Sequence, residues 1–304
     1  MFADDILGDF EKRYFGAGHK RTNYKLKEGS ECEKAEITHT SNWSEKKGCL
    51  IKPHLSTVDG IILSVMYVEK YMIDNMKFDV LDDMFLYSFE IKSGTCAIED
   101  LKDISIKIRN EKILSSEADF EVSVEGMIVR LRFRKVSVQS IYDECSKEQK
   151  KYNYISEHLK GIKHNIFGIE IDGDEITCTV SREKVDDYSY TGIGSILSKS
   201  MSILEWLIVF SQMGQILAYD IDSIDRQNSE TLWMKNVKAE IVNPVEYKGN
   251  ISVSGGVTKK SLLNIKSDNW RIFEMAGSSA DGNVRFQGKI AHILPNEKKE
   301  VRYE

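Results

Sequence analysis

Residues 52–63, KPHLSTVDGIIL, stand at the start of a long apolar segment around which the rest of the chain is predicted to fold. Pro53 cannot lie inside a helix, because it lacks an N–H group and has a fixed φ angle. Ser56 is a favourable N-cap residue, and Asp59 then falls in the first turn, where the helix dipole favours a negative charge. The apolar run that follows predicts a helix over about 56–73.

A second apolar helix is predicted over about 200–219, and it aligns with the first without a gap. The alignment places Glu205 where Asp59 stands, at an offset of 205 − 59 = 146 residues, close to half of the 304-residue chain. Strand-like stretches with a period of two repeat as well. Residues 35–38 resemble 175–178, residues 85–91 resemble 232–238, and residues 129–133 resemble 284–288.

The repeated order of elements predicts an α+β protein made of two similar halves. A helix that is apolar nearly all round is a buried helix, and a curved antiparallel sheet around one buried helix is the hot-dog fold. We therefore predict a tandem double hot-dog, with two long central helices that are each wrapped by a curved antiparallel β-sheet. The expected halves are residues 1–143 and 164–304, and the polar segment 144–163 is the expected linker. A β-sandwich with two inserted helices is the alternative.

Composition and patterning disfavour several functional classes. The net charge of −6 argues against a nucleic-acid or lipid-headgroup surface, since both need clustered positive charge. No apolar run reaches the length of a membrane span, and the acidic N-terminal stretch lacks the apolar centre of a signal peptide. The five cysteines contain no CxxC pair, so no metal site is expected. The expectation is a cytoplasmic protein without membrane or nucleic-acid partners.

The two acids at the helix starts are the first candidates for a functional site. A first-turn carboxylate can simply satisfy free N–H groups, and this structural explanation stays open for both. A carboxylate on a buried helix is otherwise costly, so Asp59 is the first candidate for a catalytic acid and Glu205 the second. His54 is the candidate general base, because it precedes a helix start with an acid nearby and histidine as a residue type is suited to general acid–base chemistry. Glu205 would face His54 across the interface between the halves.

Three further residues are candidates for substrate binding. Ser56 and Thr57 carry two hydroxyl groups at the start of the first helix. His19 lies in the glycine-rich segment GAGHKR (16–21), just ahead of the first predicted strand.

Several short motifs resemble those of the avirulence D (AvrD) proteins of plant-pathogenic bacteria. They are Leu7-Gly8, RYFGAGHKR (13–21), Trp43-Ser44 and PHLSTVD (53–59), and length and element order agree along the chain. The resemblance implies an enzyme of secondary-metabolite biosynthesis that forms syringolides, which are acylated sugar-derived lactones. The implied substrates are a β-ketoacyl thioester, carried by coenzyme A or acyl carrier protein, and a small sugar-like molecule. The implied chemistry is acyl transfer, condensation, dehydration or cyclisation, without a cofactor of the protein's own.

The predicted fold also resembles that of hot-dog dehydratases, in which an acid at the start of the central helix faces a histidine across the subunit interface. The resemblance implies a pair that moves protons next to a thioester carbonyl, which a backbone N–H polarises. The dehydratase signature His-Phe-Pro-Gly is absent, since His54 stands only 59 − 54 = 5 residues before Asp59. This departure argues against the standard dehydration route.

Two alternatives to an enzyme stay open. One is a non-catalytic double hot-dog protein that binds an acyl chain or a small lactone. The other is an interaction protein with a degenerate site. In each case the chain is expected to be a monomeric pseudo-dimer or a homodimer.

Overall fold

The computed structural model of the chain describes residues 1–27, 33–76, 81–94, 96–136, 151–186, 188–247, 249–265 and 268–295. The α-helices in these ranges are α1 (Ala3–Leu7), α2 (Thr57–Met76), α3 (Tyr154–Glu157) and α4 (Ile203–Ile221). The strands are β1 (Thr22–Lys27), β2 (Glu33–His39), β3 (Glu45–Lys46), β4 (Cys49–Leu50), β5 (Met84–Lys92), β6 (Ile104–Ile113), β7 (Glu117–Val124), β8 (Met127–Lys135), β9 (Lys151–Asn153), β10 (Ile162–Asp172), β11 (Glu175–Lys184), β12 (Ser189–Thr191), β13 (Trp233–Ile241), β14 (Ile251–Ile265), β15 (Asp268–Ser279) and β16 (Val284–Ile293). Within the part of the chain described, no helix is long and apolar enough to cross a membrane.

One large antiparallel sheet forms the framework of the structure. Its strand order is β1-β2-β6-β7-β8-β5-β13-β16-β15-β14-β11-β10. The sheet is continuous through its middle because β5 pairs with β13, with Ile91 opposite Val237 and Phe89 opposite Ala239. A large antiparallel sheet with few helices confirms the α+β class expected from the sequence.

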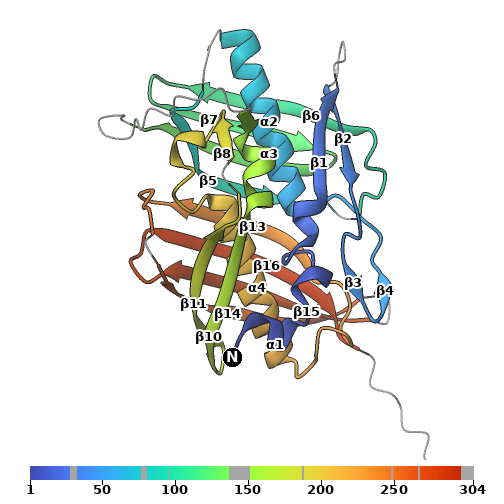
Figure 1. The fold of residues 1–304 in the computed structure, drawn as a ribbon. Helices are drawn as coiled ribbons and strands as arrows, with labels where there is room; N and C mark the ends of the chain where they lie inside the picture. Colours follow the sequence, from blue (N-terminus) through green and yellow to red (C-terminus); the bar gives the residue numbers. More distant parts are fainter. Residues whose placement is uncertain are drawn as a thin grey trace, which may run out of the picture.

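The sheet consists of two halves with the same topology (Figure 1). From one edge to the middle the order is β1-β2-β6-β7-β8-β5, and from the other edge it is β10-β11-β14-β15-β16-β13. Helix α2 precedes β5 in the chain, and α4 likewise precedes β13. The stretches matched in the sequence lie in equivalent strands, β2 with β11, β5 with β13, and β8 with β16.

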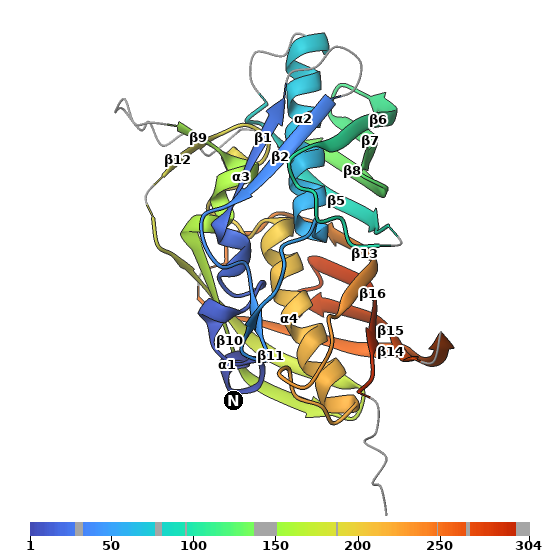
Figure 2. The ribbon, with the colours of Figure 1, turned by 90° about the vertical axis from the view of Figure 1, so that its right-hand side faces the viewer.

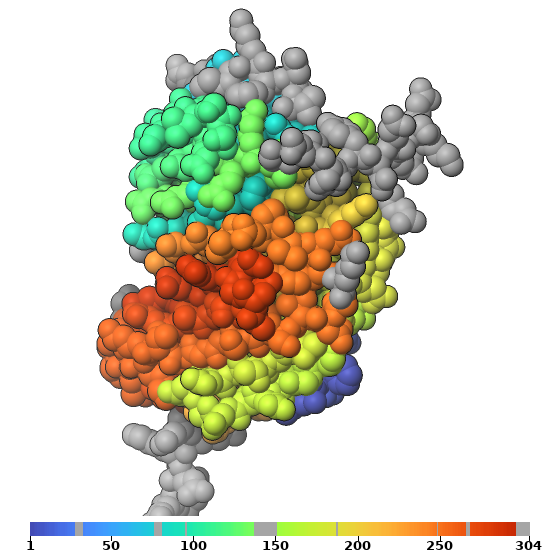
Figure 3. All heavy atoms as spheres, turned by 90° about the vertical axis from the view of Figure 1, so that its left-hand side faces the viewer, coloured from blue at the N-terminus to red at the C-terminus, as the bar shows by residue number. Residues whose placement is uncertain are grey.

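The two long helices lie on the inner side of the curved sheet, close to the ranges predicted from the sequence (Figure 2). Strands β1, β2, β10 and β11 lie on one side of the helices, and the other strands of the sheet lie on the opposite side. The outer face of the sheet is a continuous surface that runs from the first half into the second (Figure 3). The helices are therefore core elements, as their apolar character predicts.

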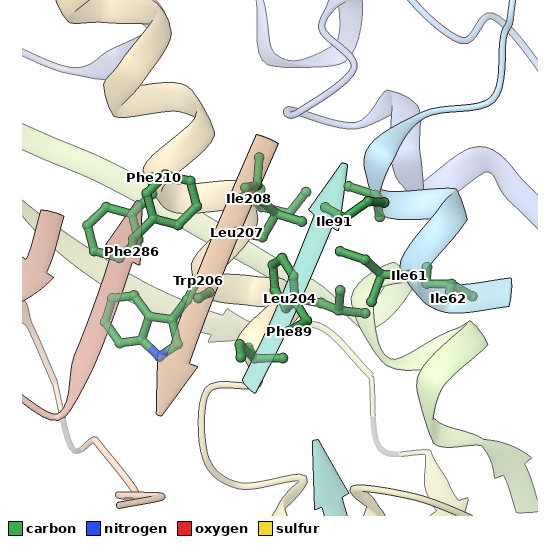
Figure 4. Packing of buried hydrophobic residues seen from close by; sticks show 14 of the residues in the cluster. Ile61, Ile62, Phe89, Ile91, Leu204, Trp206, Leu207, Ile208, Phe210 and Phe286 are labelled. Atoms are coloured by element: carbon green, nitrogen blue, oxygen red, sulfur yellow. The ribbon is translucent and has the colours of Figure 1, made fainter. Parts of the chain in front are cut away.

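The halves share one hydrophobic core (Figure 4). Phe89 and Ile91 on β5 lie between Ile61 of α2 and Leu204 of α4. The same cluster of buried apolar side chains extends through both halves of the sheet. Because both helices pack on the joining strands, the halves are expected to unfold together.

The polar segment 144–163, predicted as a linker, is folded over its described part. Residues 144–150 lie outside the described residues. From Lys151 the chain forms β9, α3 and a 3-10 turn at His158–Gly161, and it continues directly into β10. Tyr154, Ile155, His158 and Leu159 are buried here. The apolar residues among the charges are therefore part of the packed structure, and the boundary between the halves at residue 164 stays a prediction.

Phe89→Ala is the test of the shared core. Phe89 is 1% exposed on the strand that joins the halves, so the cavity left by the ring should lower the free energy of unfolding by about 3–5 kcal/mol. Urea unfolding should show one transition, shifted to lower urea concentration. Leu262→Ala on exposed β14 is the control and should change stability by about 0.5 kcal/mol or less. Separate transitions for the two halves would contradict a shared core.

Candidate functional site

A cavity of about 290 Å³ opens at the start of α2, between the two halves. Its wall combines the N-terminal segment, residues near the start of α2, the second half of α4 and the loop from α4 into β13. The polar and aromatic side chains of this wall include Arg13, Tyr14, Trp43, Lys46, His54, Ser56, Thr57, Gln215, Tyr219, Arg226, Trp233, Lys235 and Trp270. The volume is near the lower end of the range for small-molecule sites.

His54 lies in the cavity wall among aromatic rings. Its ring centroid is 4.7 Å from that of Trp43 and 5.4 Å from that of Trp233. His54 Nδ1 lies 3.3 Å from the carbonyl oxygen of Lys52. A carbonyl oxygen only accepts hydrogen bonds, so Nδ1 is the donor in this contact. In the neutral ring this tautomer leaves the lone pair on Nε2, which can then accept a proton from a bound molecule.

Asp59 does not line the cavity but closes a capping box at the start of α2. Its Oδ2 accepts the Ser56 N–H at 2.9 Å, and Ser56 Oγ accepts the Asp59 N–H at 3.1 Å. The hydroxyl of Tyr24 on β1 donates to Asp59 Oδ1 at 2.7 Å. Burial raises the pKa of Asp59 despite these hydrogen bonds. Asp59 therefore has the structural role that the sequence left open, that of a carboxylate that satisfies free N–H groups at the helix start. His54 and Asp59 do not contact each other.

Tyr14 connects this buried network to the cavity. It was not among the site residues predicted from the sequence. Its hydroxyl hydrogen-bonds Ser56 Oγ, and its ring lies 4.7 Å from that of Trp43. Burial, and then the charge of Asp59, raise the pKa of Tyr14 well above its usual value. The phenol is therefore neutral at the cavity wall. Its only sequence signal is the motif RYFGAGHKR, in which it stands.

The remaining predicted substrate-binding residues divide between the cavity and the core. Ser56 and Thr57 line the cavity. His19 is buried outside that wall, and its Nδ1 donates to the Tyr14 carbonyl oxygen at 2.8 Å. Burial lowers the pKa of His19 to about 3, so the ring is neutral. A contact between His19 and substrate stays a prediction, whereas its support of the Tyr14 backbone is observed.

The second half builds an equivalent capping box with a different charge balance. Ser202 and Glu205 exchange the same two hydrogen bonds at the start of α4, at 3.0 and 3.1 Å. Glu205 Oε2 also lies 3.0 Å from His164 Nε2 and 2.8 Å from Arg182 Nε. Burial alone would raise the pKa of Glu205, but His164 and Arg182 outweigh it and lower the pKa to about 2. The expectation that Glu205 faces His54 is wrong, because its histidine is His164 of the same half.

The space next to the second helix start is filled. A cavity of only about 30 Å³ remains there, lined by Tyr154, Ile193 and the chain before α4. Glu69 of α2 holds the filling segment in place, since it accepts the Ile193 N–H at 2.9 Å and an Asn153 N–H at 2.6 Å. The same helix position in the second half, 69 + 146 = 215, is Gln215, which lines the open cavity. Only the first helix start is therefore open to a small molecule.

No group of three or more His, Cys, Asp or Glu side chains that could hold a metal ion is found among the residues the structure describes. The chemistry available at the open cavity is that of His54, the neutral Tyr14 phenol, the helix start and nearby cations.

Glu205→Gln tests the charged capping box. The substitution removes the carboxylate that pairs with Arg182, whose side chain is 13% exposed, so we expect a loss of about 3 kcal/mol in unfolding free energy at pH 7. The folded pKa of Glu205 lies below its ordinary value of 4.5. Its contribution is therefore complete above pH 4.5 and is lost as the pH falls towards 2. The wild type should lose stability over that range, and the variant should lose less.

Asp59→Asn is the matched control for Glu205→Gln. Burial raises the pKa of Asp59 rather than lowering it, so its carboxylate form gains no comparable stability above pH 4.5. Asp59→Asn should lower the free energy of unfolding at pH 7 by less than Glu205→Gln does. Urea unfolding from pH 2 to 7 measures both variants. Equal losses of unfolding free energy would contradict the proposed difference between the two helix starts.

Comparison with known proteins gives a family and several distant structural likenesses. No curated protein sequence matches the chain. The tesB protein of Mycobacterium avium subspecies paratuberculosis has 7% identity and a TM-score of 0.48, over 89% of this chain and 96% of that one. A hot-dog protein of unknown function from Alicyclobacillus acidocaldarius has 6% identity and a TM-score of 0.46, over 95% and 98%. The dehydratase domain of RzxB from Pseudomonas fluorescens has 9% identity and a TM-score of 0.36, over 82% and 88%. The model of the family described as Pseudomonas avirulence D protein (AvrD) matches residues 2–295, and the chain therefore belongs to the AvrD family.

Proposed function

We propose that this chain is an enzyme of secondary-metabolite biosynthesis that acts on a β-ketoacyl thioester at the start of α2. The observation that carries the proposal is the convergence of an open cavity, His54 and the start of a buried helix at one point. Membership of the AvrD family supports a syringolide-like product, an acylated sugar-derived lactone. The proposed architecture is a tandem double hot-dog, because each half wraps one buried helix in antiparallel strands.

The helix start supplies the electrostatic part of the chemistry. The first N–H groups of a helix have no acceptor within it, and Ser56 Oγ takes only that of Asp59. Thr57, at the first helical position, lines the cavity. The unused N–H groups and the positive end of the helix dipole would stabilise negative charge on a thioester carbonyl oxygen. This stabilisation is needed in acyl transfer and in formation of an enolate.

His54 supplies the proton transfer in this proposal. The carbon between the two carbonyl groups of a β-ketoacyl thioester is acidic, because its anion is delocalised over both oxygens. Nε2 of His54, which holds a lone pair when Nδ1 donates to Lys52, would accept that proton. The carbon nucleophile would then condense with a carbonyl group of the sugar-like substrate, and a substrate hydroxyl would displace the thiol to close the lactone. Asp59 acts here as a positioning residue, because it fixes Ser56 and the helix start.

The composition of the cavity wall supports the proposal of two dissimilar substrates. Trp43, Trp233 and Trp270 give it apolar surface for an acyl chain. Gln215 and Tyr219 add hydrogen-bonding groups for a hydroxylated molecule. We propose coenzyme A or acyl carrier protein as the carrier of the acyl group, and no cofactor held by the protein itself.

A non-catalytic protein that binds an acyl chain or a small lactone is the second candidate. One observation favours it. Within the described part of the chain no carboxylate contacts His54, so the acid–histidine pair of a dehydratase-like site is not assembled at the open cavity. In this function the aromatic wall would bind the ligand and His54 would be only part of the lining.

His54→Gln distinguishes the two functions. Glutamine keeps a polar side chain between the tryptophans but cannot take up the proton, so product formation should fall by about two to four orders of magnitude. The measurement is metabolite profiling of cells that express the chain, followed by the rate of product formation from a β-ketoacyl thioester. Thermal unfolding of the variant checks that the fold is kept.

Lys107→Gln is the control for this experiment. Lys107 is exposed on β6 and lies outside the cavity wall, so product formation should stay near that of the wild type. Near-normal product formation by a folded His54→Gln protein would sink the catalytic role. A wild-type protein that yields no new product but binds a lactone would support the second candidate.

A further inference from the structure

Cations gather in the wall of the open cavity although the whole chain is acidic. Arg13, Lys46, Arg226 and Lys235 line it, and no carboxylate is part of the described lining. Asp4 pairs with Arg13 from the exposed side. The local excess is therefore 4 − 1 = 3 positive charges, in a chain whose net charge is −6.

Arg226 is the centre of this group. It is 8% exposed, and its Nη2 donates to three neutral oxygens, the carbonyl groups of Lys12 at 3.3 Å and Glu45 at 2.8 Å and the hydroxyl of Ser44 at 3.3 Å. These contacts hold its guanidinium beside the residues that precede Arg13 and Lys46 in the chain. Among the described residues no carboxylate pairs with Arg226, and a buried charge without a counter-charge is costly.

Two buried donors of the same wall have no acceptor among the described residues. They are Nε of Arg13 and the indole Nε1 of Trp43. The side chains are 3% and 6% exposed, respectively, and both line the cavity. Buried donors almost always have an acceptor in a folded protein, so these groups indicate that acceptor atoms are supplied by a bound molecule.

We infer that the cavity binds a phosphorylated small molecule, whose phosphate group is held between Arg13, Lys46 and Arg226. Two guanidinium groups and an ammonium group match a phosphate dianion in charge and in number of donors better than they match a single carboxylate. The inference deepens the proposed function by naming the chemical class of one substrate. It rests on the proposed function only in taking this cavity to be the substrate site.

The phosphate has two possible sources, and direct binding measurements separate them. Three of the four tryptophans of the chain line the cavity, so intrinsic fluorescence reports on occupancy. The probes are ribose 5-phosphate for a phosphorylated sugar and coenzyme A for a phosphorylated acyl carrier. Ribose and pantetheine are their uncharged counterparts. We expect ribose 5-phosphate, coenzyme A or both to quench the fluorescence, and each uncharged counterpart to bind at least about 10-fold more weakly.

Lys46→Met and Arg226→Met are the decisive variants. Each removes one charged donor and should weaken the affinity for the binding phosphate by about 10- to 100-fold. Lys46 is only half-buried, so it tests the site even if Arg226→Met fails to fold. Lys52→Met is the matched control, because this lysine lies outside the cavity wall, and its affinity should equal that of the wild type.

A pH series provides an independent readout. Burial, and then the nearby charge of Arg226, lower the pKa of Lys46 to about 8, with Glu230 opposing and Lys47 adding to the shift. Lys46 also lies over the ring of Tyr219. Lys46 is charged below pH 8 and neutral above it, while a phosphate monoester stays a dianion from pH 7 to 9. Affinity should therefore fall as the pH rises from 7 to 9, and Lys46→Met should lose much of that dependence.

Three outcomes would overturn the inference. They are no binding of either phosphorylated probe at about 10 mM, equal binding of the uncharged counterparts, and unchanged affinity in both folded cation variants. His54→Gln keeps this test separate from the proposed function. If that variant binds phosphate normally and still forms product, catalysis by His54 fails while the phosphate site stands. If neither phosphorylated probe binds and His54→Gln abolishes product formation, the phosphate site fails while catalysis by His54 stands.

Discussion

The free N–H groups at the start of each buried helix are the constraint on which the rest of the structure depends. Water cannot satisfy those that the sheet encloses, so the chain itself must supply acceptors for them. Both halves do so with a serine and an acid three residues later, Ser56 with Asp59 and Ser202 with Glu205. The acids also bind the edge strand of the large sheet in their own half, through Tyr24 on β1 and His164 on β10. One local requirement thus fixes how each helix sits against its strands.

The two halves meet this requirement with different charges. Glu205 is an ion held by Arg182 and His164, whereas Asp59 is held by neutral hydroxyl and amide groups in a site whose burial raises its pKa. The space next to the two helix starts also differs between the halves. Glu69 holds a loop over the second helix start, while Gln215 leaves the first one open. The second half has a closed, ion-paired helix start, and the first half has a helix start that reaches a cavity.

Much of the fold could be predicted from the sequence because the signals were local. The apolar run after Asp59, the period of two in residues such as 129–133, and the offset between Asp59 and Glu205 need no long-range contact to be seen. The burial of residues within the predicted linker could not be foreseen, because its few apolar residues are scattered among charges. Local pattern identifies elements, but it does not show which neighbour covers them.

The candidate site was harder to predict because its parts are distant in the sequence. His54, Ser56 and Thr57 could be found, since they surround a recognisable helix start. Arg226 could not, because the oxygens it binds belong to residues more than 180 positions earlier. The pairing of Glu205 with His164 and Arg182 was also missed, because it depends on the register of β10 with β11, which sets His164 opposite Arg182. A sequence pattern gives the helix start, and only the fold gives its surroundings.

The difference between the halves also bears on why the first cavity stays open. The second half shows that this fold can close the same place with a loop and a glutamate, and can pair an arginine at the helix start with a carboxylate. The first half has an open volume instead, and among the described residues Arg226 binds only neutral oxygens and two buried donors lack acceptors. Each of these features lowers the stability of the empty protein. A bound anion would remove the electrostatic cost and fill the volume, so the features that weaken the empty fold are the ones that would bind the ligand.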